Sequence, residues 1–413
     1  MMKGLAARLR RLDRSRPPAG SALRERLERM DRAASSSRRA PIDRFVVGDR
    51  VDTPAGPVFR VVRTAPASKA HGRLPVGELG RLPCEGLRDL FPRELGRVGA
   101  PPEIAFLDTE TTGLAGGAGT VAFLVGVGRW DPGGRGFRVV QLFLEDLDRE
   151  PALLHALARE LEGVSCLVTF NGHRFDVPLL ENRHVLNRMA WPLEGAPHLD
   201  LLPPARALWR PTLSNCRLVT LEAGVLAVRR TGDVPGAEIP ALYGRYLRHG
   251  AEERLGRVFS HNRIDILSLA GLLWAAGRAA RRPVGPQALG VGLLHAQARR
   301  PDRAHRALAA GLDHAPSRGD RIRALRELGR AHKARGDWHA ALAVWQEWAG
   351  LEPHRLEPVE EAAKALEHRL RDPGRALAWV ERALGLPHWP PADRAALEHR
   401  RDRLRRKAGD RGV

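Results

Sequence analysis

The sequence of 413 residues contains few cysteines: only Cys84, Cys166 and Cys216, in no CxxC or other metal-ligand spacing. This scarcity argues against a disulfide framework or a zinc ribbon and favours a reducing compartment. A long apolar run is also missing, since the longest, residues 266–277, is too short to cross a bilayer. The N-terminus lacks the continuous apolar segment of a secretory signal. These absences predict a soluble, cytoplasmic protein with no membrane association.

Lysine is almost absent as well, because only five of the 68 basic residues are lysine and the rest are arginine. With 48 acidic residues the net charge is +20, which favours a polyanionic partner, although an arginine excess also fits a G+C-rich genome. The charge is uneven. Residues 1–99 carry 22 basic and 11 acidic residues, residues 100–280 carry 19 and 20, and residues 281–413 carry 27 and 17. A bound polyanion is therefore expected to be attracted mainly by the flanks.

Composition and periodicity divide the chain into five segments. Residues 1–40, rich in Arg, Ser, Ala and Pro, are predicted to be a mobile basic arm. Residues 41–100 include "RFVVGDRVDTPAGPVFRVVR", which predicts two strands around a turn and hence a small β-containing lead. The main domain is predicted at 101–282 and a set of helical repeats at 286–390. Residues 391–413 form a basic tail, expected to be a solvated helix end.

The main domain alternates strand-like and helix-like stretches. Strands are predicted at 103–110, 121–130, 137–144, 166–172 and 198–202. Helices are predicted at 149–163 and 175–189, and the remainder to about 280 is expected to be helical. Three consecutive antiparallel strands followed by βαβ crossovers predict an α/β fold with a mixed five-stranded sheet and flanking helices, the ribonuclease H-like arrangement.

The segment after 286 shows only helical periodicity, with an internal repeat. Alanines recur at spacings of 37 and 35 residues, each followed four residues later by a large apolar residue and then by a proline: Ala304, Leu308 and Pro316; Ala341, Trp345 and Pro353; Ala376, Val380 and Pro387. The spacing lies near the tetratricopeptide period, so an all-α tetratricopeptide-like domain is predicted. An ordinary helical bundle with a coincidental spacing is the alternative.

Acidic residues at three separate places are the candidates for chemistry. Asp108 and Glu110 are one residue apart in "FLDTETTGL", so strand alternation places their side chains on one face. Asp176 begins a helix after a strand and an Asn-Gly turn, and Asp265 lies on a helix four residues after His261. In a crossed α/β sheet the carboxyl ends of neighbouring strands open onto one crevice, where all of these side chains are expected to meet.

Four converging carboxylates repel one another unless cations lie between them. Carboxylate oxygens are the hard ligands that Mg²⁺ or Mn²⁺ prefers, and two such ions can stabilise the attacking and leaving oxygens of a phosphodiester hydrolysis. His261 is then placed to accept the proton of the attacking water. The sequence thus predicts a metal-dependent nuclease.

The stretches "FLDTETTGL", "FNGHRFDVP" and "HNRID", taken together, resemble the three motifs of the DEDD 3′–5′ exonuclease superfamily. Their order and spread are similar to the bacterial YprB-like branch, which can carry tetratricopeptide repeats. The resemblance covers about residues 101–280. It implies that Asp108, Glu110, Asp176 and Asp265 bind two metal ions, and that the terminal nucleotide lies near three further residues: Thr111, Leu114 and Asn171. A single-stranded 3′ end of DNA or RNA is the implied substrate.

One spacing departs from the resemblance. "HNRID" has three residues between His261 and Asp265, whereas enzymes of this superfamily with a histidine base usually have four. The assignment of His261 as the base therefore stays open. Two other functions are open too: a protein-interaction scaffold in which the repeats bind a partner and the nuclease domain is weakly active or inactive, and a ribonuclease H-type endonuclease.

Overall fold

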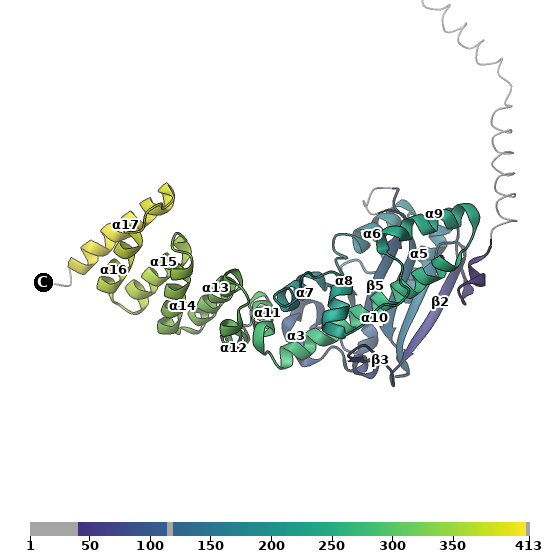
Figure 1. Ribbon diagram of the computed structural model, residues 1–413, viewed down its shortest axis with the longest axis horizontal. Helices are drawn as coiled ribbons and strands as arrows, with labels where there is room; N and C mark the ends of the chain where they lie inside the picture. The colour runs from purple at the N-terminus through teal and green to yellow at the C-terminus, as the bar shows by residue number, and fades with distance from the viewer. Residues whose placement is uncertain (1–39, 114–118, 410–413) are drawn as a thin grey trace, which may run out of the picture.

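The computed structural model describes residues 40–113 and 119–409. An α/β part and an all-helical part lie end to end, and the helices that follow residue 285 form an extended arm (Figure 1). The predicted basic arm at 1–40, apart from Ala40, lies outside the described residues, and so does Leu114. No helix of the described ranges combines the length and the hydropathy that crossing a bilayer requires.

The α/β part is built on a seven-stranded mixed sheet in the order β1-β2-β7-β6-β5-β8-β9. The strands β5, β8 and β9 are parallel, and the other neighbours are antiparallel. The bounds are β1 (Asp49–Thr53), β2 (Gly56–Pro66), β5 (Ile104–Thr111), β6 (Ala122–Trp130), β7 (Gly136–Phe143), β8 (Cys166–Thr169) and β9 (His198–Asp200). A separate two-stranded ladder joins β3 (Ala70–His71) to β4 (Leu74–Pro75).

The five strands predicted for the main domain are all present, and they form the mixed sheet that was expected. The two strands predicted as a separate lead are β1 and β2, and they extend this sheet to seven strands. β2 pairs with β7 from Phe59↔Phe143 to Pro66↔Gly136. This pairing covers an edge of β7 that would otherwise leave its backbone N–H and C=O groups open to another chain.

Helices cover the sheet: α5 packs on β1, β2 and β7, and α10 packs across β5, β6 and β7. The helices of this part are α3 (Glu85–Leu90), α4 (Pro92–Leu95), α5 (Glu150–Glu160), α6 (Asp176–Leu186), α7 (Leu202–Trp209), α8 (Leu218–Leu221), the π-helix η5 (Glu222–Leu226), α9 (Ile239–His249) and α10 (Glu253–Arg281). The stretch from 203 to 280 was expected to be helical throughout. It is interrupted at 210–217, at 250–252 and by the loop 227–235, which has glycine and proline at Gly232 and Pro235.

Side chains alternate along β5 between two buried clusters, one for each face of the sheet. Ala105 and Leu107 belong to one cluster, and Ile104 and Phe106 belong to the other. The second cluster also contains Ile266 of α10. Continued alternation therefore gives Asp108 the face on which α10 lies.

Two glycines of β6 allow α10 to approach this face closely. A Cβ atom at Gly126 would lie 2.3 Å from both Asn262 Oδ1 and Ile266 Cδ1, and one at Gly128 would lie 2.3 Å from Ile266 Cγ2. Asp108 pairs with Gly126 in the β5–β6 ladder. The missing side chain at Gly126 is thus the reason that a helix residue can reach the backbone level of Asp108.

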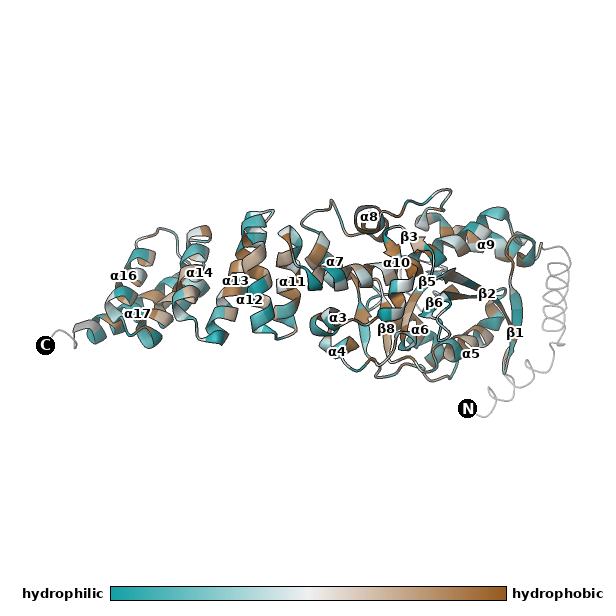
Figure 2. Cartoon of the chain, turned by 90° about the horizontal axis from the view of Figure 1, so that it is seen from below, coloured by the Kyte–Doolittle hydropathy of each residue, from teal (hydrophilic) through white to brown (hydrophobic). Residues whose placement is uncertain are grey.

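The helical part consists of consecutive helix pairs, whose mixed brown and teal surfaces in Figure 2 are typical of amphipathic helices. The bounds are α11 (Gly285–Gln297), α12 (Pro301–Gly311), α13 (Arg318–Arg335), α14 (Trp338–Leu351), α15 (Leu356–Lys364) with the π-helix η8 (Ala365–Arg369), α16 (Pro373–Leu384) and α17 (Pro391–Gly409). Each alanine of the predicted repeat is buried in the second helix of a pair: Ala304, Ala341 and Ala376. The helix-rich region is confirmed, and its tetratricopeptide identity stays a prediction.

Helix α17 differs from the solvated helix end that was expected. Leu397 and Leu404 are fully buried on the side that packs against α16. Lys407 donates to Glu367 over 3.0 Å, and Arg403 pairs with the same carboxylate. Apolar burial attaches the basic tail to α16, and these ion pairs attach it to η8.

Replacement of Gly126 by alanine tests the close approach of α10. The added methyl group would collide with Asn262 and Ile266, so we expect a loss of about 1–3 kcal/mol in the free energy of unfolding. Urea denaturation measures it. Gly236→Ala is the control, because a Cβ atom there meets nothing within 4 Å. Equal stability of the two variants would mean that α10 does not depend on the glycine.

Candidate functional site

Asp108 is held by a chain of amides from α10 and β7. Asn262 Nδ2 donates to Asp108 Oδ2 over 2.8 Å and to the Asp108 carbonyl over 3.2 Å. The other end of the amide, Asn262 Oδ1, accepts from Gln141 Nε2 over 2.8 Å, and Gln141 Nε2 also donates to the Phe259 carbonyl. Asn262 and Gln141 are buried. Gln141 thus orients the Asn262 amide through Oδ1, and Asn262 in turn holds Asp108 through Nδ2.

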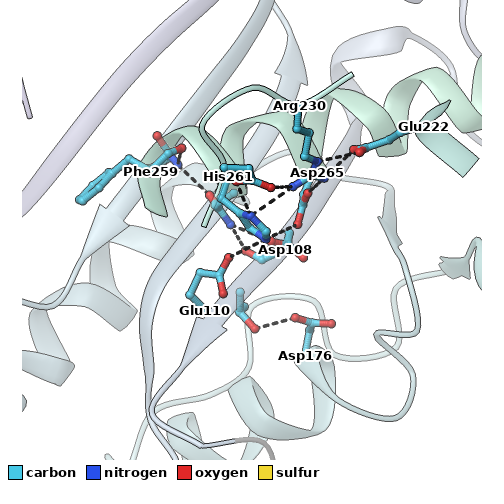
Figure 3. A network of polar contacts seen from close by, with 12 residues as sticks. Asp108, Glu110, Asp176, Glu222, Arg230, Phe259, His261 and Asp265 are labelled. Atoms are coloured by element: carbon cyan, nitrogen blue, oxygen red, sulfur yellow. Dashed lines mark hydrogen bonds and ion pairs between the residues drawn. The ribbon is translucent and has the colours of Figure 1, made fainter. Parts of the chain in front are cut away.

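Glu110, His261 and Asp265 form a tight cluster beside Asp108. Their ligand atoms all lie within 4.8 Å of one another. His261 Nε2 is 3.5 Å from Asp265 Oδ2 and 3.9 Å from Glu110 Oε1. The four-residue spacing on α10 puts His261 and Asp265 on one face, as predicted, and Figure 3 shows both turned toward the two carboxylates of β5.

Asp176 comes from α6, the helix that follows β8 in the chain, and its partner on β5 is Thr109. It is the first residue of α6, as predicted, and its Oδ1 accepts a hydrogen bond of 2.6 Å from Thr109 Oγ1. Thr109 lies between Asp108 and Glu110 and, by strand alternation, points away from both. Figure 3 accordingly shows Asp176 set apart from the cluster on α10. Its charge is still close enough to raise the pKa of Asp108 and Glu110.

Arg230 supplies the nearest positive charge. Its guanidinium donates to Glu222 through Nε (2.7 Å) and Nη2 (2.6 Å), to Asp233 through Nη1 (3.1 Å), and to Asp265 Oδ1. Both Arg230 and Glu222 are buried, with side chains 6% and 0% exposed. Burial opposes its charge, but the bonds and charges of Glu222 and Asp265 raise the pKa of Arg230 above its ordinary value. Arg230 therefore stays charged and holds one oxygen of Asp265.

His261 has a carboxylate partner on its other nitrogen. His261 Nδ1 lies 2.8 Å from Asp233 Oδ1 and 3.2 Å from Arg230 Nη1. Although burial opposes it, bonds from His261 and Arg230 lower the pKa of Asp233. In the tautomer with the proton on Nδ1, that N–H donates to Asp233, and Nε2 is then the accepting nitrogen on the side of Glu110 and Asp265.

The carboxyl groups of the site resist ionisation. Burial, followed by the charges of its acidic neighbours, raises the pKa of Asp108 well above its usual range, and the same causes raise the pKa of Glu110. Burial also raises the pKa of Asp265 to about 6, against the opposing influence of His261 and Arg230. It raises the pKa of Asp176 to about 6, against the hydrogen bond from Thr109. One arginine does not balance this many buried acids.

These observations suit a hard divalent cation. Carboxylate oxygens from β5 and α10 converge. Burial shields them from water, and their ionised forms lack enough positive charge nearby to balance them. Oxygen donors of this kind match Mg²⁺ or Mn²⁺ rather than the sulfur-rich sites of zinc or copper. The three residues whose ligand atoms lie close enough to share one ion are Glu110, His261 and Asp265. Asp108 and Asp176 lie near enough for their charges to interact with this group.

The residues predicted near the terminal nucleotide have local backbone contacts. Thr111 Oγ1 donates to the Gly113 carbonyl over 2.9 Å. Asn171 adopts a positive φ of 64°, and its N–H donates to Asp200 Oδ1 over 2.7 Å. Asp200 also accepts from the Leu202 N–H, so it anchors the turn after β8. The role of Thr111 and Asn171 at a nucleotide stays a prediction, and Leu114 lies outside the described residues.

Sequence reasoning missed Arg230, Asp233, Glu222 and Asn262. Arg230 and Asp233 lie in the loop 227–235 with no motif around them, and the arginine-rich composition hides one important arginine among many. Asn262 is different, because it lies inside "HNRID" next to His261. Its place inside that motif, between His261 and Asp265, is the signal by which the sequence could have pointed to it.

Comparisons with known proteins agree with the fold. Residues 105–276 match the family model described as RNase_H superfamily, and this range contains Asp108, Glu110, Asp176, His261 and Asp265. The chain is also 31% identical over 287 residues to the uncharacterized protein YprB of Bacillus subtilis (strain 168), with 68% of each chain covered.

The pH dependence of cation binding tests the site. In the folded protein Asp176 and Asp265 have a pKa of about 6 instead of 3.8, so their protonation stabilises the fold at low pH and this contribution is lost as pH rises through about 6. A cation requires the ionised forms. We therefore expect Mn²⁺ to raise Tm strongly at pH 7.5 and little at pH 5, as measured by calorimetry.

Asp108→Asn provides the matched variant for this measurement. It removes one buried charge and keeps an acceptor for Asn262, so in EDTA at pH 7.5 we expect Tm to rise by about 2–4 °C. The same variant should lose the Mn²⁺-induced shift. A Mn²⁺ shift that is equal in both proteins would place the ion elsewhere.

Proposed function

The chain belongs to the RNase H superfamily, and we propose that it is a metal-dependent 3′–5′ exonuclease that hydrolyses phosphodiester bonds of nucleic acid. The observation that carries the proposal is the meeting of Asp108 and Glu110 at the end of β5 with His261 and Asp265 of α10. All four lie inside the region that matches the superfamily. Their motifs also resemble the DEDD exonucleases in order.

Asp108, Glu110, Asp176 and Asp265 would hold the cations. Two bound Mg²⁺ or Mn²⁺ ions would supply positive charge that activates water and stabilises the negative charge developing at the phosphodiester. The chain's own contribution is to keep these carboxylates in place: Asn262 orients Asp108, Thr109 orients Asp176 and Arg230 fixes Asp265. Fixed ligands of this kind avoid reorganisation during the reaction.

His261 is the proton acceptor in this proposal. Asp233 binds Nδ1–H and leaves Nε2 free to take a proton from water on the side of Glu110 and Asp265. The three-residue spacing between His261 and Asp265 does not prevent this arrangement, because positions four apart share a face of α10. The position of Nε2, 3.5 Å from Asp265 and 3.9 Å from Glu110, supports the proposal that His261 is the general base.

The helical arm supports a second function. Its consecutive pairs of amphipathic helices are typical of protein-interaction scaffolds, so a protein partner could bind there while the α/β part is weakly active. The two proposals are separated by activity. A scaffold with an inactive domain would have no reason to retain the Asn262 and Arg230 contacts around the acids.

A time course on 5′-labelled single-stranded DNA and RNA tests the exonuclease. With Mg²⁺ or Mn²⁺ we expect a ladder that shortens from the 3′ end, and no cleavage in EDTA or with Asp108→Asn. The sugar that is degraded identifies the substrate. Cleavage of a 3′-blocked strand would instead indicate an endonuclease, and intact label in every lane would favour the scaffold.

Asp233→Asn tests the orientation of His261. The neutral amide accepts more weakly from Nδ1–H than the carboxylate does, and its NH₂ group can turn toward Nδ1 and favour the other tautomer, so we expect kcat to fall about 10–100-fold, as for other partners of metal-site residues. The acidic limb of the pH profile should move at the same time. The control is Asp313→Asn, whose side chain is 90% exposed far along the chain. An unchanged pH profile would mean that Asp233 has only a structural role.

A further inference from the structure

Two adjoining hollows lie where the α/β part meets the helical arm. One, of about 450 Å³, is lined by residues of α3, α10, α11 and α12, and the other, of about 500 Å³, by residues around the end of α10 and the start of α11. The two share Arg281. The helices α3, α10 and α11 pack against one another at this junction, where Figure 1 shows them close together.

Six arginines contribute to the lining of the two hollows. Five of them have no carboxylate partner in the described ranges and are called the junction arginines below: Arg73, Arg278, Arg281, Arg282 and Arg306. All five are exposed. A sixth, Arg303, is paired with Asp89. One acid, Glu85, also lines the smaller hollow and lies 3.7 Å from Arg303.

Several arginines elsewhere in the helical arm have acidic partners. Arg321, Arg330 and Arg335 pair with acidic residues, and so do Arg400, Arg403 and Arg405 of the basic tail. At the junction, five exposed arginines line two adjoining hollows without a carboxylate partner of their own in the described ranges, and Glu85 is the one acid in the lining. Like charges gathered in this way repel one another, and a bound polyanion would relieve the repulsion.

We propose that the junction arginines bind the phosphate backbone of a nucleic acid strand. Arginine presents a planar fork of donors that matches phosphate oxygens. The tryptophans nearby do not offer stacking surfaces, because Trp209 and Trp274 are only 4% and 9% exposed and Arg278 lies over the Trp274 ring at 4.9 Å. Binding through phosphates without base stacking is independent of base sequence.

The position of this surface gives it a use in the proposed nuclease, on which this part of the inference rests. Arg281 follows Asp265 by 16 residues on the same helix, which at 1.5 Å per residue is about 24 Å. At the 3.4 Å rise of a DNA strand, about seven nucleotides cover this distance, and an extended strand needs fewer. The acidic site repels a polyanion, so attraction has to come from a separate place. The junction arginines would hold the strand while its end enters the site.

Binding can be measured without catalysis. The protein is the full chain with Asp108→Asn, in EDTA, and the probe is a fluorescein-labelled single strand of about 20 nucleotides followed by anisotropy. Replacement of Arg278, Arg281 and Arg282 by glutamine should weaken binding at least tenfold and lower the magnitude of the slope of log K against log salt by about two, at about 0.7 for each phosphate contact of a single strand. A variant with only Arg281→Gln and Arg282→Gln keeps Arg278 on Trp274 and should show about two-thirds of the change in slope.

The control removes the same charge elsewhere. Arg355, Arg375 and Arg394 are exposed residues of the helical arm, with side chains 50–63% exposed, and their replacement by glutamine should change affinity less than twofold. Equal binding by the junction and control variants would overturn the proposal. Competition by polyglutamate as effective as that of unlabelled strand would also overturn it, in favour of an acidic protein partner.

Cleavage separates this inference from the proposed function. In the active chain, the junction variant should degrade the long strand more slowly and a strand of about four nucleotides at the normal rate. If the unaltered chain cleaves nothing but binds strand through the junction arginines, the nuclease proposal fails and the binding surface stands. If cleavage is normal for both lengths in the junction variant, the surface has no part in holding substrate.

Discussion

The mutual repulsion of buried carboxylates at the end of β5 is the constraint on which the rest of the site depends. Burial is the largest cause that raises the pKa of Asp108, Glu110 and Asp265, and the charge of Asp265 raises the pKa of Asp108 and of Glu110 further. Folding brings these groups together in spite of this cost. The surrounding contacts from Asn262 and Arg230 reduce it only in part. Buried carboxylates with too little positive charge around them are suited to bind cations, because a divalent ion supplies that charge.

The position of α10 depends on two glycines of β6, which have no side chains to hold the helix away from the sheet. Gly126 and Gly128 let the helix lie directly on β5 and β6, and this contact carries Asn262, His261 and Asp265 to the strand end. The same helix runs on to the junction with the helical arm and ends there at Arg281. One rigid element therefore connects the acidic site to the arginine-lined surface. Their separation is set by the helical rise and does not depend on a flexible loop.

Charge is divided between the parts of the molecule in a way that fits this arrangement. The region that contains the acids is nearly neutral, whereas the residues after 281 carry a clear excess of arginine. Several arginines of the helical arm are used in ion pairs between helices, among them Arg321, Arg330 and Arg335. The junction arginines, by contrast, have no carboxylate partner in the described ranges. From net charge alone, the attraction for a polyanion would be expected along all of residues 281–413.

Much of the fold and the members of the acidic site follow from sequence alone. Alternation along β5 places Asp108 and Glu110 on one face, and the four-residue spacing of His261 and Asp265 places them on one side of a helix, because these periods are local properties of the backbone. The five strands of the main domain were predicted for the same reason. Tertiary structure alone decided the rest. It joined β1 and β2 to the sheet, brought Asp176 of α6 to Thr109 of β5, and brought Arg230 and Asp233 from an irregular loop to Asp265 and His261. Those contacts join residues far apart in the chain, and no local period records which of 68 basic residues packing will bury beside an acid.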